Sequence, residues 1–173
     1  IYSLPDARTF DLLQIKQSVT FTPFIQNVLY FALFVGFGVL AACFPFHVWS
    51  PDGHVAAPTA ASMLHAGVLM KLGAFGILRI GVYLFPEGAR FWAPTIAVLA
   101  LCNIVYGALV ATQQRDLKYI IGYSSVSHMG IVLLGIATMT VSGFNGALFQ
   151  MFSHGIMPAL FFACVGFIYD GCH

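Results

Sequence analysis

Charged residues are scarce in this chain. Lysine, arginine, aspartate and glutamate together make up 8% of its 173 residues, while 60% are hydrophobic; a soluble globular domain is charged at roughly a quarter of its residues. The net charge is only +1, and no segment carries a stripe of basic side chains, so the sequence offers no electrostatic basis for binding nucleic acid. This composition predicts an integral membrane protein that sits in a lipid bilayer.

The sequence also lacks the motifs that hold metals, clusters or nucleotides. Its four cysteines contain no CxxC pair, which argues against a zinc site or an iron–sulfur cluster. A phosphate-binding glycine loop and a nucleophile elbow are absent as well. We therefore expect no cofactor and no metal in this chain, and we expect any redox chemistry that it serves to take place elsewhere.

Long apolar runs dominate instead. A membrane-spanning helix needs about 20 mostly apolar residues, and five segments satisfy this length: residues 24–46, 60–84, 92–112, 119–139 and 143–169. They predict an all-α fold, a polytopic transmembrane bundle. The more polar residues 1–23 are predicted to lie outside the membrane or at its interface. Because the chain starts at Ile1 rather than Met and stops directly after an apolar run, we expect an internal fragment of a longer polytopic protein.

Turn-forming and charged residues separate these runs. Asp116 is well placed to cap the fourth helix and Thr59 the second. The connector "HVWSPDGHVAAPT" is predicted to be an interfacial loop with a Pro-Asp-Gly turn. His47, Asp52 and His54 within it could mimic a metal site, but no further ligand follows at helical spacing, so we do not expect one.

Lys71 lies in the middle of "GVLMKLGAFG", almost midway along the second predicted helix. A charge at the bilayer centre costs roughly 2.5–3.5 kcal/mol on insertion scales, and this side chain is too far from either helix end to reach the interface easily. Two states remain open: a neutral amine favoured by desolvation, or an ammonium that faces a hydrated, partnered interior. One proton separates them, which makes Lys71 a candidate site of proton translocation.

Two histidines lie at a similar depth, His128 near the middle of the fourth predicted helix and His154 near the middle of the fifth. Each has polar neighbours on its own side of the helix. They could be polar core residues that hold helices together, but three titratable nitrogen bases near one depth favour a hydrated line for proton transfer. The neighbours that would support it are Ser124 and Ser125 before His128, and Gln150 before His154.

Two further groups are weaker candidates. Lys118, two residues after Asp116 in "QQRDLKYIIGYSS", could take up protons at the membrane rim; alternatively it belongs to a solvated helix start and pairs with Asp116. His65 lies six residues before Lys71, about 240° around an ideal helix. We therefore expect His65 to face elsewhere, as a packing residue or as a side branch of the line.

Three stretches of the sequence resemble a known family: "FPFHVWSPDGHVAAPTAASMLHAGVLMKLGAFGILRIG", "QRDLKYIIGYSSVSHMGIVLLGI" and "GALFQMFSHGIMPALFF". They are similar to the antiporter-like subunit M, or chain 4, of respiratory complex I, the NADH-quinone oxidoreductase of the respiratory chain. Their PFHxWxPDxH, DLK…SSVSHMG and Q-M-x-x-H-G signatures are specific in combination. Related sequences occur in Mrp-type cation/proton antiporters and in membrane-bound hydrogenases.

The resemblance implies a fold of about fourteen helices with two inverted repeats and no cofactor, in a bacterial inner membrane beside other membrane subunits and a hydrophilic arm. It also implies that a central lysine passes protons along a hydrated axis through histidines, coupled to quinone reduction elsewhere in the complex. Lys71 matches that lysine, His128 and His154 match the histidines, and Lys118 matches the lysine of the DLK motif. Leu40 departs from the pattern, because the family usually has a second lysine there.

The sequence thus favours a proton-translocating subunit without a redox centre of its own. One alternative is a subunit of a cation/proton antiporter or a membrane-bound hydrogenase, which would transport ions without a quinone reaction. Another is a non-pumping structural paralogue, in which the buried polar residues only hold helices together. Replacing Lys71 would then harm assembly and leave transport unaffected.

Overall fold

The structure is a computed structural model that describes residues 10–172, and helices are the only regular elements among these residues. Residues 1–9 of the predicted surface segment 1–23 lie outside the described part. In chain order the elements are α1 (Leu12–Ser18), α2 (Pro23–Leu40), α3 (Trp49–Ala56), α4 (Thr59–Leu64), η1 (His65–Leu69), α5 (Met70–Gly76), η2 (Ile77–Val82), α6 (Pro86–Gln113), α7 (Leu117–Ala137) and α8 (Val141–Cys172).

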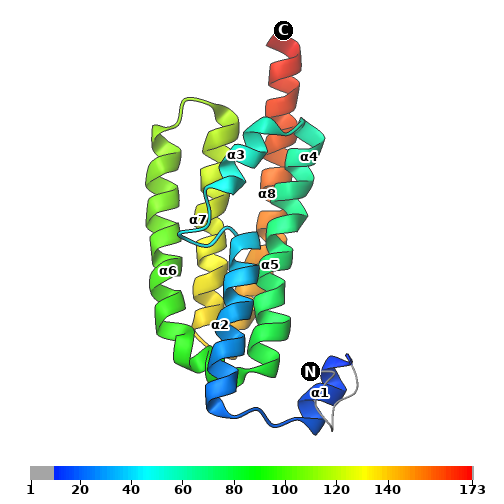
Figure 1. Cartoon of the computed structure of the whole chain (residues 1–173). Coiled ribbons are helices and arrows are strands. Elements are labelled where there is room, and N and C mark those ends of the chain that lie inside the picture. Colours follow the sequence, from blue (N-terminus) through cyan, green and yellow to red (C-terminus); the bar gives the residue numbers. More distant parts are fainter. Residues whose placement is uncertain (1–9, 173) are drawn as a thin grey trace.

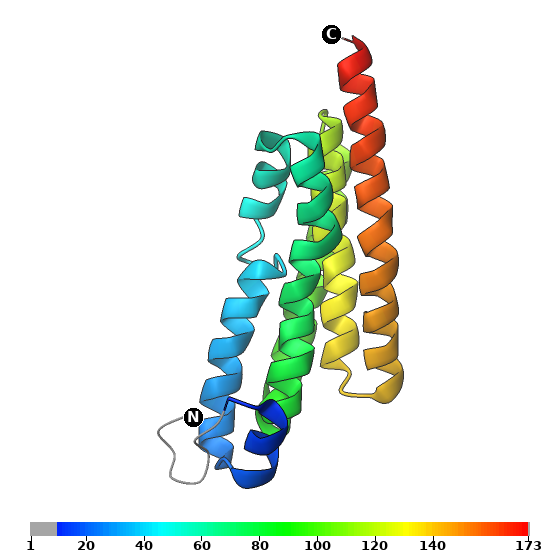
Figure 2. The same cartoon turned by 90° about the vertical axis from the view of Figure 1, so that its right-hand side faces the viewer.

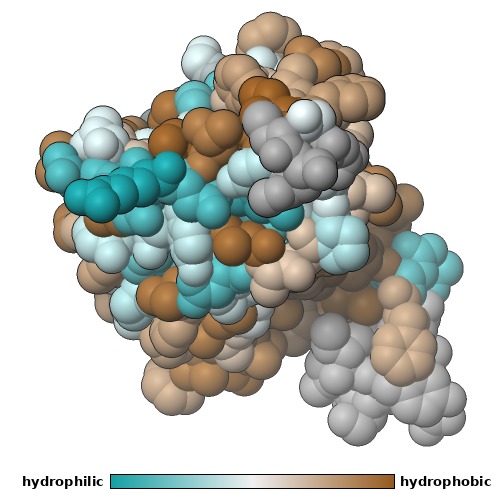
Figure 3. Space-filling model, turned by 90° about the horizontal axis from the view of Figure 1, so that it is seen from above, coloured by the Kyte–Doolittle hydropathy of each residue, from teal (hydrophilic) through white to brown (hydrophobic). Residues whose placement is uncertain are grey.

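Five helical stretches are long and apolar enough to cross a membrane: α2, the continuous helix from α4 to η2, α6, α7 and residues 141–169 of α8. They alternate in direction (Figure 1), and the C-terminal end of α8 rises beyond the other helices (Figure 2). Seen from above, hydrophilic residues gather on the end of the bundle while hydrophobic residues line its sides (Figure 3). The prediction of an all-α polytopic bundle is confirmed.

The long helices enclose one common core. Helix α6 packs against α2 and α7, α7 packs against α8, α8 packs against α4 and η1, and α5 packs back against α2. Apolar side chains from α5 and α7 fill the centre and are almost fully buried, as Met70, Met129, Val132 and Leu133 are. The buried polar residues described below therefore lie among closely packed helices.

Glycine permits the closest of these approaches. A Cβ atom added at Gly73 in α5 would lie 2.5 Å from the backbone nitrogen of Ala41 and 2.6 Å from the carbonyl oxygen of Phe37. Real Cβ atoms do not approach backbone atoms so closely, so no larger residue fits without moving one helix. Gly73 thus sets the depth at which the end of α2 meets α5, two residues from Lys71.

The helix boundaries differ from the predicted ones in ways that local chemistry explains. The Asp116 cap is confirmed, since its carboxylate accepts a hydrogen bond of 2.7 Å from the Lys118 backbone nitrogen. The Thr59 cap is wrong: Pro58 is the capping residue and makes no side-chain bond, and Thr59 is already helical. Helix α6 starts at Pro86, because proline suits the first helical turn, where its missing N–H is not needed.

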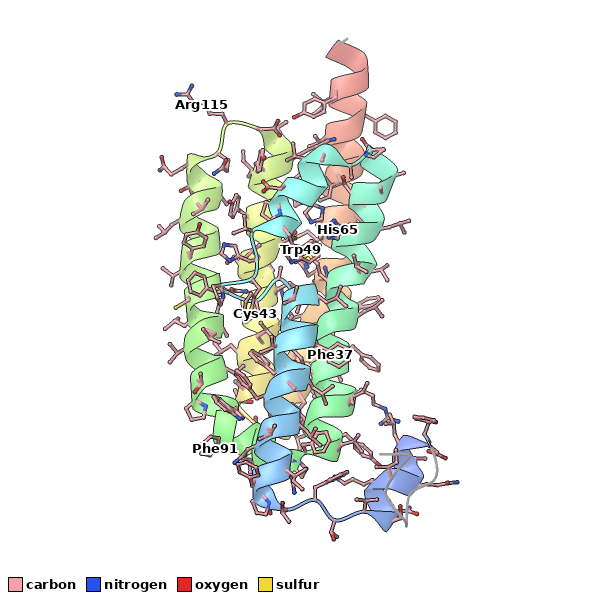
Figure 4. The ribbon with its side chains drawn as sticks, viewed as in Figure 1. Phe37, Cys43, Trp49, His65, Phe91 and Arg115 are labelled. Atoms are coloured by element: carbon pink, nitrogen blue, oxygen red, sulfur yellow. The ribbon has the colours of Figure 1, made fainter. Side chains whose placement is uncertain are left out.

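The first predicted span, 24–46, was too long. Helix α2 ends at Leu40, the chain then follows an irregular path with a positive φ of 53° at Ala42, and α3 begins at Trp49. Pro45 explains the break, because its ring would clash with the carbonyl four residues earlier and it cannot donate a helical hydrogen bond. Figure 4 places Cys43 in this break, between the upper end of α2 and α3.

The connector after the break is not a loop with a Pro-Asp-Gly turn, so that prediction was wrong. Pro51, Asp52 and Gly53 lie inside α3, which continues toward the end of the bundle that α2 does not reach (Figure 1). Helices α2 and α3 therefore act together as one discontinuous helix. At the opposite end, the short α1 begins with a hydrogen bond of 2.8 Å from the Leu13 backbone nitrogen to the Asp11 carboxylate.

We predict that Gly73→Ala in the full-length protein destabilises the bundle by about 1–3 kcal/mol, the usual cost of overpacking. The matched control is Gly36→Ala in α2, where an added Cβ meets no atom within 4 Å. Helix propensity makes that change neutral or stabilising by about 0.5–1 kcal/mol. Thermal unfolding midpoints of the purified proteins in detergent compare the two, and an equal midpoint shift in both variants would contradict the packing.

Candidate functional site: a buried row of nitrogen bases

Lys71 is the charged residue at the centre of the bundle. It lies in α5 with 9% of its surface exposed, and its ammonium nitrogen donates a hydrogen bond to the carbonyl oxygen of Ala66 in η1. It lines an otherwise apolar groove of about 560 Å³ between α4, η1 and α5 on one side and α8 on the other, together with residues such as Phe75 and Gly155. The amine therefore has an acceptor within its own helix but no carboxylate beside it among the described residues.

That acceptor comes from an irregularity in the helix. Residues 65–69 form a π-helical turn, in which backbone bonds run to the fifth residue rather than the fourth. Single π turns within α-helices are frequent at functional sites. The Lys71 side chain bonds the oxygen five residues before it. This bond reduces the cost of burying the charge, since a buried charge is costly unless it is hydrogen-bonded.

His128 and His154 meet across the interface between α7 and α8. Their ring centroids lie 5.0 Å apart, and Nδ1 of His128 shares a hydrogen bond of 3.1 Å with Nε2 of Gln150. His154 is 1% exposed, and neither of its ring nitrogens has a partner among the described residues. Buried polar atoms are nearly always paired in proteins, with protein groups or with ordered water. The sequence therefore identified two histidines and a glutamine that the fold brings together.

The two predicted serines lie beside this pair. Ser124 and Ser125 line a groove between α7 and α8, with Pro158 on its other wall. Ser125 is buried, and its hydroxyl has no partner within residues 10–172. Together with His154, it leaves polar atoms at the α7–α8 interface that two or three water molecules could satisfy, since a buried water typically makes about three hydrogen bonds.

His54 and His65 form a second pair, which the sequence analysis missed. The His54 ring centroid lies 4.2 Å from that of His65 and 4.9 Å from that of Phe162 in α8. His65 also stacks on Trp49, at 5.0 Å between ring centroids, and Figure 4 shows the two lying together between α3 and α4. His54 is fully buried, and neither of its nitrogens, nor Nε2 of His65, has a partner in the described part.

The expectation for His65 used an ideal helix of 3.6 residues per turn. The π turn between His65 and Lys71 winds the chain through a smaller angle per residue, so the angle of about 240° does not apply here. His54 was assigned to an interfacial loop and is instead held inside α3. No spacing in the sequence signalled the pair, because His54 and His65 lie in separate helical elements, α3 and η1.

No metal site results from this arrangement. His47 packs its ring against Phe44 and Tyr106, at centroid distances of 5.6 and 5.0 Å, whereas Asp52 accepts a hydrogen bond of 3.1 Å from the Tyr119 hydroxyl. Across residues 10–172, no three histidine, cysteine, aspartate or glutamate side chains are placed to hold a metal ion.

Lys118 lies apart from the row, at the end of the bundle. Its ammonium donates to the carbonyl oxygen of Ala57 at 3.2 Å and lies 5.8 Å from the centre of the Tyr169 ring. Asp116 contacts Lys118 through the backbone nitrogen and accepts a further bond of 3.2 Å from Tyr169. Ten residues, about 15 Å of α-helix, separate Lys118 from His128. The fold therefore places it at the rim rather than in the buried row.

A last group of contacts supplies hydrogen-bond partners to the backbone in the break between α2 and α3. The sequence analysis did not predict these contacts. Asn103 of α6, fully buried, accepts a hydrogen bond of 2.5 Å from the Phe44 backbone nitrogen and donates one of 3.0 Å to the Ala42 carbonyl. The Trp49 indole nitrogen donates at 3.0 Å to the Val39 carbonyl. Leu40, where the resemblance expects a lysine, is the last residue of α2 and lies against Gly73.

Comparisons with known proteins agree with this architecture. The chain is 42% identical over its whole length to NADH-quinone oxidoreductase subunit M of Rickettsia prowazekii (strain Madrid E), of which it covers 35%. It is 43% identical, over 96% of its length, to NAD(P)H-quinone oxidoreductase chain 4 2 of Microcystis aeruginosa (strain NIES-843 / IAM M-2473), of which it covers 30%. The chain thus spans about a third of the length of these relatives.

A solved structure shares the fold. A chain of respiratory complex I from Thermus thermophilus, solved with bound NADH, superposes with a TM-score of 0.88 at 28% sequence identity, over 94% of the present chain and 34% of the other. The family model described as NADH:quinone oxidoreductase/Mrp antiporter, TM, matches residues 1–173. The chain is therefore part of an integral, multi-pass membrane protein, and it belongs to the NADH:quinone oxidoreductase/Mrp antiporter transmembrane family.

Proposed function

We propose that this chain is the central part of the antiporter-like subunit M of a bacterial NADH-quinone oxidoreductase, and that it moves protons across the inner membrane while quinone is reduced elsewhere in the complex. Its partners are then the other membrane subunits and the hydrophilic arm. We infer the complex from the names of the relatives that the chain resembles. The buried row formed by Lys71, His128 and His154 supplies the chemistry.

The observation that carries the proposal is the burial of several titratable nitrogens in an apolar bundle, together with polar atoms that have no partner among the described residues. Within residues 10–172 the Lys71 ammonium has a single acceptor, the Ala66 carbonyl, so losing a proton costs one hydrogen bond rather than a network. His128 and His154 lie 5.0 Å apart between ring centroids, a separation that one water molecule can bridge. We therefore propose that a proton passes between these two rings through water.

The coupling in this proposal is electrostatic. Like charges repel in a medium of low dielectric constant, so in this proposal a proton on one base opposes a second proton on the next. A change of charge in a neighbouring subunit that releases the lysine proton would lower the barrier to loading His128 or His154. Titrations linked in this way belong to the group of sites rather than to one residue.

Further residues at one end of the row and along it have supporting roles in this proposal. His54 and His65 extend it toward α3 and the end of the bundle, where Lys118 and Asp116 lie at the rim. We propose that protons reach the row from this end through Lys118 and the His54–His65 pair. Ser124, Ser125 and Gln150 orient the water and the rings along it.

We predict that Lys71→Met in the full-length subunit, within its native assembly, leaves assembly intact and lowers redox-driven proton uptake about 100-fold. A proton crossing without a titratable group there meets the roughly 2.5–3.5 kcal/mol cost of a bare charge at the membrane centre. Proton uptake is recorded beside the quinone reductase rate in vesicles, after a native gel. Arg79→Met, an exposed change in the same composite helix, is the control, and normal pumping by Lys71→Met would refute the mechanism.

Gln150→Leu should slow proton uptake about 2- to 10-fold, since the hydrogen bond to His128 that it removes is worth about 0.5–1.5 kcal/mol. The control is Asn145→Leu, an exposed position on the same helix. Comparing the uptake rates of the two variants isolates the contact with His128 from general effects on α8. Equal rates in both variants would mean that His128 does not relay.

Replacing sodium and potassium with choline separates this proposal from a cation/proton antiporter. A proton-translocating subunit should give the same redox-driven uptake in either medium, because the described row offers nitrogen bases and no cluster of carboxylates for a metal cation. Uptake that requires sodium or potassium would favour the antiporter. A quinone-independent exchange of sodium for protons would favour it too.

A further inference from the structure

Asn103 is a buried amide in the middle of α6, and its three hydrogen bonds all go to backbone groups of neighbouring segments. It is 0% exposed. Its side-chain oxygen accepts from the Phe44 nitrogen at 2.5 Å, and its side-chain nitrogen donates to the Ala42 carbonyl at 3.0 Å and to the Val126 carbonyl at 3.5 Å. One side chain therefore contacts both the break between α2 and α3 and helix α7.

The break needs such partners. In hydrocarbon, each backbone N–H or C=O group has to be paired within the protein, and irregular backbone persists there only where the protein supplies the bonds. Between Leu40 and Trp49 the helical ladder is interrupted. Asn103 pairs one donor and one acceptor of this segment at once, which an amide can do because it carries an acceptor oxygen and a donor NH₂ group.

The position of Asn103 is itself fixed by close packing. A Cβ atom added at Gly130 of α7 would lie 2.8 Å from the Cβ atom of Asn103 and 2.8 Å from the Ala100 carbonyl oxygen. Helix α6 therefore lies directly against the α7 segment that carries His128, two residues before Gly130. This close contact also holds the side-chain amide of Asn103 next to the break between α2 and α3.

We propose that Asn103 is a positioning residue for proton transfer: it fixes the discontinuous helix α2–α3 against α7, so that His54 and the end of α2 keep their places beside the row of bases. The effect on pumping rests on the function proposed above, whereas the effect on the break does not. Asn103 touches none of the bases itself. It acts through the backbone on which His54 is carried and through the Val126 carbonyl.

The requirement for both a donor and an acceptor gives a sharp test. An aspartic acid at this position has an acceptor oxygen and one O–H donor when protonated, and acceptors alone when ionised. In Asn103→Asp, the side chain should therefore make both hydrogen bonds to the break at acidic pH and lose the donated one at alkaline pH. The change should fall between about pH 5 and about pH 9, where buried carboxyls titrate. Asn103→Leu should fail throughout.

Other groups near the amide also titrate and need a reference. Cys43 and His47 lie in the break, Tyr106 lies one turn along α6, and Tyr123 and His128 lie on α7. The wild type and Asn103→Leu carry all of them, so their profiles over the same pH range subtract these contributions. Asn145→Asp, at an exposed position of α8, controls for adding a carboxylate and should follow the wild type.

The experiment uses the full-length subunit in its native assembly with Cys43 as its sole cysteine, the others being replaced by serine. Cys43 lies in the break and is 1% exposed, so its labelling rate with a membrane-permeant maleimide, relative to the Asn103 protein at each pH, reports on the break. Redox-driven proton uptake is measured on the same samples. We expect Cys43 to be labelled at least tenfold faster in Asn103→Leu at every pH. In Asn103→Asp we expect the faster labelling only at alkaline pH. Proton uptake should be lost under the conditions in which labelling is faster.

Each other outcome has a distinct meaning. Unchanged labelling of Cys43 in Asn103→Leu overturns the role of Asn103, as does labelling in Asn103→Asp that does not depend on pH. The proposed function would still stand in either case if Lys71→Met stops pumping. Faster labelling without any loss of uptake shows that Asn103 only supports the fold. If the wild type itself does not pump, the proposed function fails while the labelling pattern stands. If Asn103→Leu does not assemble, the pH dependence of Asn103→Asp alone decides.

Discussion

A buried ammonium needs an acceptor where the surroundings are apolar, and the hydrogen bond from Lys71 to the Ala66 carbonyl meets that need. The bond depends on the π turn at residues 65–69, which keeps this oxygen within reach of the side chain. His65 is the first residue of this turn, and its ring meets His54 and Trp49 of α3. The same local irregularity thus contains the acceptor of the lysine and one member of the second pair of bases.

The same constraint governs the discontinuous helix. Pro45 ends the helical ladder at mid-bundle, and the freed backbone groups are paired by side chains that come from elsewhere in the chain, the amide of Asn103 and the indole of Trp49. Half-helices that end inside a membrane bundle present their dipole ends to buried charges. Here the carboxyl end of α2 lies against Gly73 of α5, two residues from Lys71, and its last residue is Leu40, where the resemblance expects a second lysine.

Much of this arrangement could be predicted from the sequence. The scarcity of charge and the long apolar runs predicted five spanning helices. Within such long apolar helices, one lysine and two histidines were easily recognised as candidate site residues. The partnership of Gln150 with His128 could not be predicted, since it joins two helices whose relative rotation depends on packing. Asn103 escaped notice because one amide in an apolar helix forms no pattern, and its partners lie 59 and 61 residues away in the chain.

One error came from treating a helix as ideal. Pro45 lay inside the predicted span 24–46, and giving it the weight that proline has within a helix would have located the break. The angle between His65 and Lys71 assumed a regular α-helix, and periodicity gives no warning of a π turn. The break and the π turn both bring polar groups to the centre of the bundle, so the sequence was least informative about the site where helical geometry is irregular.

The central claim is that the row of bases is hydrated, and the most direct test is a structure of the full assembly at a resolution that shows water. We expect ordered waters within about 2.7–3.2 Å of the two ring nitrogens of His154 and of the hydroxyl of Ser125, continuing to the ammonium of Lys71. Apolar side chains packed directly against these nitrogens, with no water between Lys71 and His128, would contradict it.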